Sequence, residues 1–188
     1  MTTRRRAAAA LTVAALTLTG CAGQDKKLAA GPVQVPDPNM SSFSVPVGQA
    51  FTDGMQVFQH EGDAPAVIKS VRMAGADPGL ELVGVKIADD SRTAGAVQDF
   101  EDWPPINDPD LPSEAIKPLD TEIGPLPASN AELLIGMRAT REGRLVRKGI
   151  WIDYRIGDQD YSVYFPGGVT VCTDGRRNCN APKDWAKG

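Results

Sequence analysis

Few side chains in this sequence can do chemistry, and the most versatile is the single histidine, His60. It lies in the run Gln59-His60-Glu61-Gly62-Asp63. A histidine that activates a nucleophile or binds a metal needs partners at defined spacings, and this run lacks the second histidine of a zinc-protease helix. We therefore expect His60 to be a solvated residue beside a turn, with no catalytic or metal-binding role.

Two further groups of residues could hold a metal. Carboxylates crowd the segment from Asp99 to Asp110, and Ca²⁺ prefers such oxygen ligands, but the regular Asp-x-Asp-x-Asp-Gly spacing is missing. The thioethers could suggest a copper carrier, yet they are far apart and two fall in strand patterns, where core filling explains them better. The residues concerned are Asp99, Glu101, Asp102, Asp108 and Asp110 for calcium, and Met40, Met55, Met73 and Met137 for copper.

The first residues have the three parts of a bacterial signal peptide. Arg4, Arg5 and Arg6 precede an apolar run over residues 7–18, which is too short to span a bilayer and is followed by small residues. The residues Leu18-Thr19-Gly20-Cys21 resemble the lipobox of bacterial lipoproteins, in which the cysteine is acylated before cleavage. This resemblance implies that residues 1–20 are removed and that lipid on Cys21 holds the chain to the outer face of the cell membrane.

Charge and cysteine content restrict the remaining classes. Removing residues 1–20, which hold three arginines and no acid, changes the net charge from −4 to −7, and an acidic exported protein is a poor partner for nucleic acid. Cys172 and Cys179 remain after Cys21 is assigned to lipid, and outside the cytoplasm such a pair usually forms a disulfide. Their spacing does not match the Cys-x-x-Cys of redox or zinc sites.

The mature chain divides into a tether and one domain. Residues 21–46 are rich in Gly, Pro, Gln, Asp and Ser and predict a flexible lipidated tether, whereas residues 47–188 predict a β-sandwich. Short β-branched and aromatic segments separated by Gly, Pro and Asp predict about seven strands. They are Met55–His60, Val67–Met73, Leu80–Ile87, Glu132–Thr140, Gly149–Ile156, Tyr161–Phe165 and Val169–Cys172.

Alternation is clearest around Ile152, where apolar residues occupy every second position and a Gly-Asp-Gln-Asp turn precedes the strand at Tyr161. We expect these two strands to pair, and the strand at Glu132 to join them as a three-stranded meander. Between Pro104 and Pro127 lie seven of the 15 prolines, so we expect a long connection without regular elements there.

Two surface features could bind partners, although a simpler interpretation exists for each. Basic residues gather around one expected hairpin and could touch anionic headgroups or wall polymers, but a solvated hairpin tip is the commoner explanation. These residues are Arg138, Arg141, Arg144, Arg147 and Lys148. Trp103, Trp151 and Trp185 are too scattered to predict a sugar-stacking surface.

The chain as a whole resembles the small immunoglobulin-like lipoproteins of high-GC Gram-positive bacteria, most of which have no assigned function. The features that carry this resemblance are the lipobox, the polar tether, the segment at Ala66, the proline-rich middle and the final Val-x-Cys. The resemblance implies an immunoglobulin-like antiparallel β-sandwich outside the cytoplasm, with no cofactor. We therefore expect a non-enzymatic binding module for a membrane-protein, cell-wall or small-molecule partner. The alternative is a calcium or copper carrier, or a hydrolytic enzyme, that uses His60 and the Asp99–Asp110 segment.

Overall fold

The protein is an all-β sandwich, as the alternation of the sequence predicts. The computed structural model describes residues 28–89, 102–106, 111–175 and 179–180. All seven expected strands are present, as β2 (Ala50–Phe58), β3 (Ala66–Ala74), β4 (Leu80–Ala88), β7 (Ala131–Ala139), β9 (Gly149–Ile156), β10 (Gln159–Phe165) and β11 (Gly167–Cys172). The described residues add β1 (Asn39–Ser44), β5 (Ile116–Lys117), β6 (Glu122–Ile123), β8 (Arg144–Arg147) and the 3-10 helix η1 (Ser113–Ala115).

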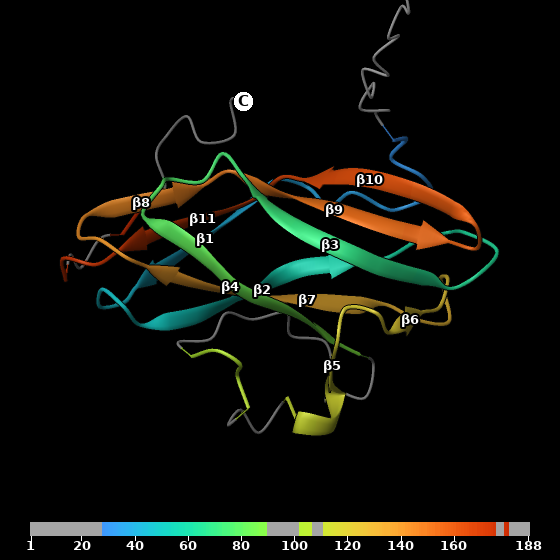
Figure 1. Cartoon of the computed structure of the whole chain (residues 1–188), viewed down its shortest axis with the longest axis horizontal. Coiled ribbons are helices and arrows are strands. Elements are labelled where there is room, and N and C mark those ends of the chain that lie inside the picture. The colour runs from blue at the N-terminus through green and yellow to red at the C-terminus, as the bar shows by residue number, and fades with distance from the viewer. Residues whose placement is uncertain (1–27, 90–101, 107–110, 176–178, 181–188) are drawn as a thin grey trace, which may run out of the picture.

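The strands form two packed layers, and a third sheet continues one of them (Figure 1). One layer has the strand order β10-β9-β3-β6, and the layer facing it has the order β2-β7-β4-β5. A third sheet, β1-β11-β8, continues the first layer, because only Lys148 separates β8 from β9 and only Pro166 separates β10 from β11. The β1–β11 pair is parallel, whereas every other pair of strands in the described part of the chain is antiparallel.

The core lies between the layers and follows the alternation of the strands. Ile150 and Ile152 on β9 are fully buried, and Val163 on β10 lies directly opposite Ile152. Burying such side chains contributes about 1.5–3 kcal/mol each, so this hairpin is a main source of stability. The expected β9–β10 pairing is confirmed, and so is the interpretation of Met137, which is completely buried as core filling.

The expected meander is wrong, because β7 does not pair with β9. It lies in the opposite layer between β2 and β4. The run Leu133-Leu134-Ile135 is buried on both faces of that sheet, with Leu134 on the side away from the main core. A strand covered on both faces shows a continuous apolar run rather than alternation, and such a run does not indicate its neighbour.

The proline-rich connection covers the outer face of the β2-β7-β4 sheet. Leu111 and Ala115 are buried there with Leu134 and form a second small core, against which Trp103 packs. A Cβ atom on Gly136 would overlap the Trp103 ring, so this glycine permits the close approach. The expectation of no regular element is wrong in detail, because η1, β5 and β6 form within the described part of this connection.

Part of the segment that the sequence predicts as a flexible tether is folded against the sandwich. Residues Asn39–Ser44 form β1 and pair with β11, and Val33 forms an isolated bridge with His60. The polar composition of this segment is misleading because backbone hydrogen bonds, together with Phe43, dock it to the sandwich. Among the described residues, no helix is long and apolar enough to cross a membrane.

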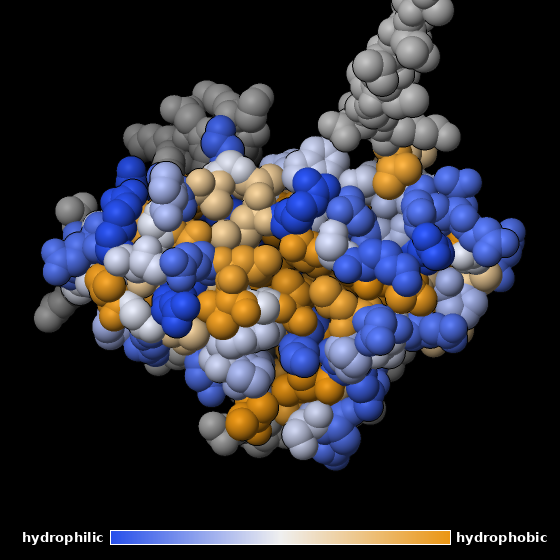
Figure 2. All heavy atoms as spheres, in the orientation of Figure 1, coloured by the Kyte–Doolittle hydropathy of each residue, from blue (hydrophilic) through white to orange (hydrophobic). Residues whose placement is uncertain are grey.

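One side of the sandwich exposes apolar residues. Figure 2 shows them gathered across the middle of the face on which β3 and β4 lie in front. On β4, Leu82 and Val83 are both exposed. Over Leu80–Lys86, β4 pairs only with β7 in the described part of the chain. The other edge of β4 therefore has no strand partner there among the described residues.

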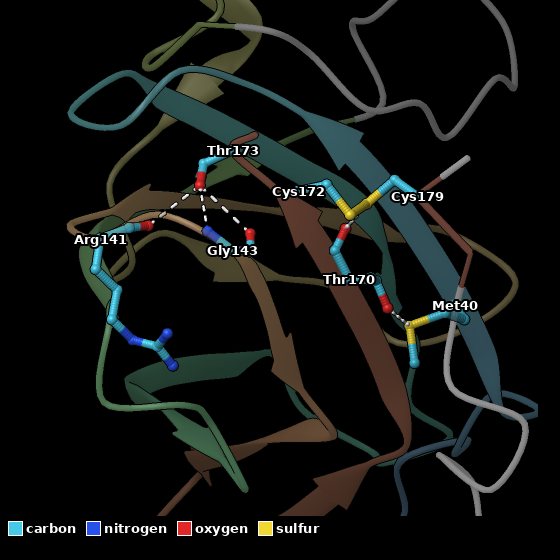
Figure 3. The surroundings of a disulfide bond; sticks show 7 residues. All are labelled: Met40, Arg141, Gly143, Thr170, Cys172, Thr173 and Cys179. Atoms are coloured by element: carbon cyan, nitrogen blue, oxygen red, sulfur yellow. Dashed lines mark hydrogen bonds between the residues drawn. A yellow bond between two sulfur atoms is a disulfide. The ribbon is translucent and has the colours of Figure 1, made fainter. Parts of the chain in front are cut away.

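Cys172 and Cys179 lie at disulfide distance at the end of β11 (Figure 3), with Cα atoms 5.6 Å apart. Beside them, Thr173 ties the end of β11 to the β7–β8 turn: its hydroxyl accepts a hydrogen bond from the Gly143 amide, 2.9 Å away. The cysteine pair therefore closes a short loop after β11, and Thr173 holds the end of β11 against the β7–β8 turn.

We expect reduction of this pair to lower the free energy of unfolding by about 2.5 kcal/mol, because opening so short a loop restores only a modest amount of unfolded-state entropy. Urea unfolding with and without reductant measures the difference, and the Cys172→Ala, Cys179→Ala double variant is the control that should not respond to reductant. Equal stability of the oxidised and reduced wild-type protein would contradict the assignment.

Candidate binding groove

His60 is not the solvated residue that the sequence predicts. It is completely buried. Its Nε2 lies 3.0 Å from the Ile123 carbonyl oxygen, and the Gly62 amide donates a hydrogen bond to Nδ1 over 3.2 Å. Nδ1 accepts from the Gly62 amide and Nε2 faces a carbonyl oxygen, so both ring nitrogens have partners within the fold. This arrangement gives His60 a structural role.

The acidic segment does not meet His60 in the described part of the chain. Asp99, Glu101, Asp108 and Asp110 lie outside the described residues, so the calcium hypothesis falls largely on residues the structure does not describe. Asp102 is exposed beside Trp103. Among the residues described, no three His, Cys, Asp or Glu side chains are arranged to hold a metal ion.

The basic residues expected on one hairpin do not form one surface. Arg147 is completely buried and forms an ion pair with buried Asp53 at 2.5 Å, while also donating to the Gly167 carbonyl oxygen at 2.7 Å. Arg138 forms an exposed pair with Glu81 at 3.3 Å, on a different sheet. The solvated-tip interpretation is therefore wrong for Arg147.

A groove lies instead on the outer face of the β10-β9-β3 sheet, and we call it the β9–β10 groove. It has a volume of about 710 Å³, within the usual range of about 300–1,000 Å³ for small-molecule sites. One wall comes from the N-terminal segment, and the floor comes from outward-facing residues of β3, β9 and β10, with core residue Val163 beneath them. The lining residues are Leu28, Ala30, Val35, Arg72, Trp151, Asp153, Ser162, Val163 and Tyr164.

Two aromatic side chains form the exposed part of the floor. Trp151 on β9 and Tyr164 on β10 occupy paired positions of the hairpin, and their ring centroids are 5.4 Å apart. Trp151 is 37% exposed, so part of its ring surface is open to the groove. A partly exposed aromatic pair on a hydrogen-bonded hairpin offers flat apolar area to a ligand with little loss of side-chain entropy.

Asp153 is the polar centre of the groove. Its carboxylate accepts hydrogen bonds from the hydroxyls of Ser70 at 2.7 Å and Ser162 at 2.6 Å, and Arg72 contacts it at 3.1 Å. Partial burial raises the pKa of Asp153, but the hydrogen bonds from Ser162, Ser70 and Arg72 outweigh it and hold the pKa below the ordinary value. The carboxylate is therefore ionised and already satisfied, which suits it to hold the strands and not to act as a general base.

We expect Asp153→Asn to reduce the loss of stability at acid pH. A carboxyl group whose pKa is lowered by folding stabilises the protein above its unfolded pKa of about 3.9, and this contribution is lost as pH falls through the lower folded value. Urea unfolding at pH 7 and at pH 3 measures the change. Ser162→Ala, which removes one donor, should give an intermediate pH dependence, whereas an unchanged dependence in Asp153→Asn would contradict the network.

The N-terminal wall is fixed to the hairpin by hydrogen bonds. The Ser162 amide donates to the Ala29 carbonyl oxygen at 2.9 Å, and the Tyr154 hydroxyl donates to the Ala30 carbonyl oxygen at 2.5 Å. Gly31 has a φ of 73°, and a Cβ atom there would overlap the Tyr154 hydroxyl. Burial and neighbouring Tyr161 raise the pKa of Tyr154, which keeps the hydroxyl protonated as the donor. The wall is thus part of the folded domain.

Comparisons with known proteins add no assignment. No family model matches this chain, and no curated protein matches it in sequence. The interpretation of this groove therefore depends on its own geometry.

The hydroxyls and the carboxylate at the polar centre of the groove are bonded to one another. The serines at its polar centre donate to Asp153, and a serine nucleophile needs a general base that takes its proton. Sequence reasoning missed this site because its residues come from three strands and the N-terminal segment. The available signal was the outward face of β9, where Trp151 and Asp153 alternate with buried residues.

Proposed function

We propose that this chain is a lipoprotein held to the outer face of the cell membrane by lipid on Cys21, and that it acts as a non-enzymatic binding module. The β9–β10 groove is the ligand site in this proposal. The observation that carries it is an open, mostly apolar groove of about 710 Å³ on the β9–β10 hairpin, with a partly exposed aromatic pair in its floor. The resemblance of Leu18-Thr19-Gly20-Cys21 to a lipobox supports the anchored location.

A binding role fits the polar centre of the groove better than hydrolysis does. The single histidine is buried and bonded through both ring nitrogens, which does not suit it to take a proton from a bound substrate. Asp153 is held ionised between Ser70, Ser162 and Arg72. Such a group orients its neighbours and contributes to a binding surface, and it has no free lone pair directed at a substrate proton.

In-cell photocrosslinking tests this proposal with two matched positions. Val35 lines the groove and is 50% exposed, whereas Val47 lies in a turn outside the groove lining and is 43% exposed. A photoreactive amino acid is placed at each position in turn, and the adducts are identified by mass spectrometry. We expect one dominant adduct from position 35 and none above background from position 47. Equal adducts from both positions, or none from position 35, would contradict a ligand in this groove.

A further inference from the structure

The β9–β10 groove has walls suited to an aliphatic chain, and we propose that its ligand is one acyl chain of a membrane lipid. This inference rests on the proposed function and names the ligand class of the same groove. Aliphatic surface comes from Leu28, Ala30 and Val35 in the N-terminal wall, and the rings of Trp151 and Tyr164 complete the floor. Apolar burial is non-directional, so such a lining binds a flexible aliphatic chain without demanding hydrogen bonds from it.

The polar residues of the groove do not favour a polar ligand. Among the lining residues, Arg72 and Ser162 are each already bonded to Asp153, and the Arg72–Asp153 pair is neutral as a unit. A site that selects a sugar or a charged solute needs unpaired donors and acceptors directed at it. Arg72 remains 59% exposed, so its guanidinium can still meet a phosphate headgroup at the rim of the groove.

The short chain between the groove and the proposed anchor restricts where the groove can lie. Residues 22–27 separate Cys21 from Leu28, which forms part of the groove wall. Seven extended Cα–Cα steps span at most about 25 Å, so the groove stays close to the membrane surface wherever the domain turns. Exposed Trp and Tyr residues favour the interface between headgroups and acyl chains, and this favours Trp151 and Tyr164 facing the bilayer. The occupant is therefore a lipid of that bilayer.

Photolabelling of the full chain carrying Cys21→Ala tests whether the groove takes an acyl chain. The probe is a photoreactive analogue of palmitic acid, used without detergent, and labelled peptides are mapped by mass spectrometry. We expect saturable labelling at one site, confined to the peptides that contain Val35, Trp151 and Tyr164. Val35→Asp should weaken binding at least about tenfold by placing a charge in the apolar wall, and the matched Val47→Asp variant should bind as the wild type does.

A second experiment distinguishes the source of the acyl chain. The lipidated protein is placed in vesicles that contain a photoreactive phosphatidylglycerol, and the labelled peptides are mapped in the same way. Labelling of the same groove peptides supports a bilayer lipid as the ligand. In another outcome, the fatty acid labels the Cys21→Ala protein but the vesicle lipid does not label the lipidated protein. The protein's own lipid then fills the groove, and the proposal is overturned. Labelling spread evenly over the surface also overturns it. A protein adduct from position 35 in cells, without acyl labelling, would keep the binding module and reject only the lipid ligand.

Discussion

Arg147→Ala is expected to lower the free energy of unfolding by about 3–5 kcal/mol, because it leaves the buried Asp53 carboxylate without its partner. Both side chains are completely buried, and Arg147 also donates to the Gly167 carbonyl oxygen at the start of β11. The variant therefore loses a contact between β2, β8 and β11 as well as a charge pair. Urea unfolding at neutral pH measures the loss.

A surface pair provides the matched control for this prediction. Arg138 and Glu81 lie 3.3 Å apart, but their side chains are 45% and 52% exposed, so Arg138→Ala should change the free energy of unfolding by no more than about 1 kcal/mol. If Arg147→Ala does not fold, the Asp53→Leu, Arg147→Met double variant should recover a folded protein, because it removes both buried charges together. Similar losses in Arg147→Ala and Arg138→Ala would contradict the buried pair.

Cys21→Ala is expected to move the protein almost completely from the membrane fraction to the soluble fraction. A lipidated cysteine with several acyl chains holds a protein firmly, since each buried methylene contributes about 0.8 kcal/mol, whereas the variant has no acceptor for the lipid. Fractionation of cells followed by immunoblotting measures the distribution. Ser44→Ala, a substitution at an exposed position of β1, is the control that should stay with the membrane. A Cys21→Ala protein that still pelleted with membranes would contradict the anchor.

The sequence pattern predicted the pairing of strands that are neighbours in the sequence. The β9–β10 hairpin could be predicted because Ile150, Ile152 and Tyr154 alternate with outward residues and a four-residue turn segment follows. The strand β7 could be located but not paired, because its continuous apolar run fits any central position of a sheet. Pairing between distant strands depends on packing that a single sequence does not display.

The roles of the polar residues and the position of the groove were harder to predict than the fold, for two physical reasons. Buried polar residues are recognised only through their partners, and those partners are distant: His60 bonds to the Ile123 carbonyl 63 residues away, and Arg147 bonds to Asp53 94 residues away. The groove also depends on the N-terminal segment around Ala30, whose composition predicts a flexible tether. In the structure, the Ser162 amide and the Tyr154 hydroxyl hold this segment against the sheet.

The most direct test of an anchored binding module asks whether occupancy of the groove depends on the anchor. Crosslinking from position 35 in cells is compared between the lipidated protein and the same protein carrying Cys21→Ala. We predict one dominant adduct in the lipidated protein and at least about a tenfold smaller yield in the variant, because the variant is no longer held beside the membrane. An equal yield from both proteins, or no adduct from the lipidated protein, would contradict the account.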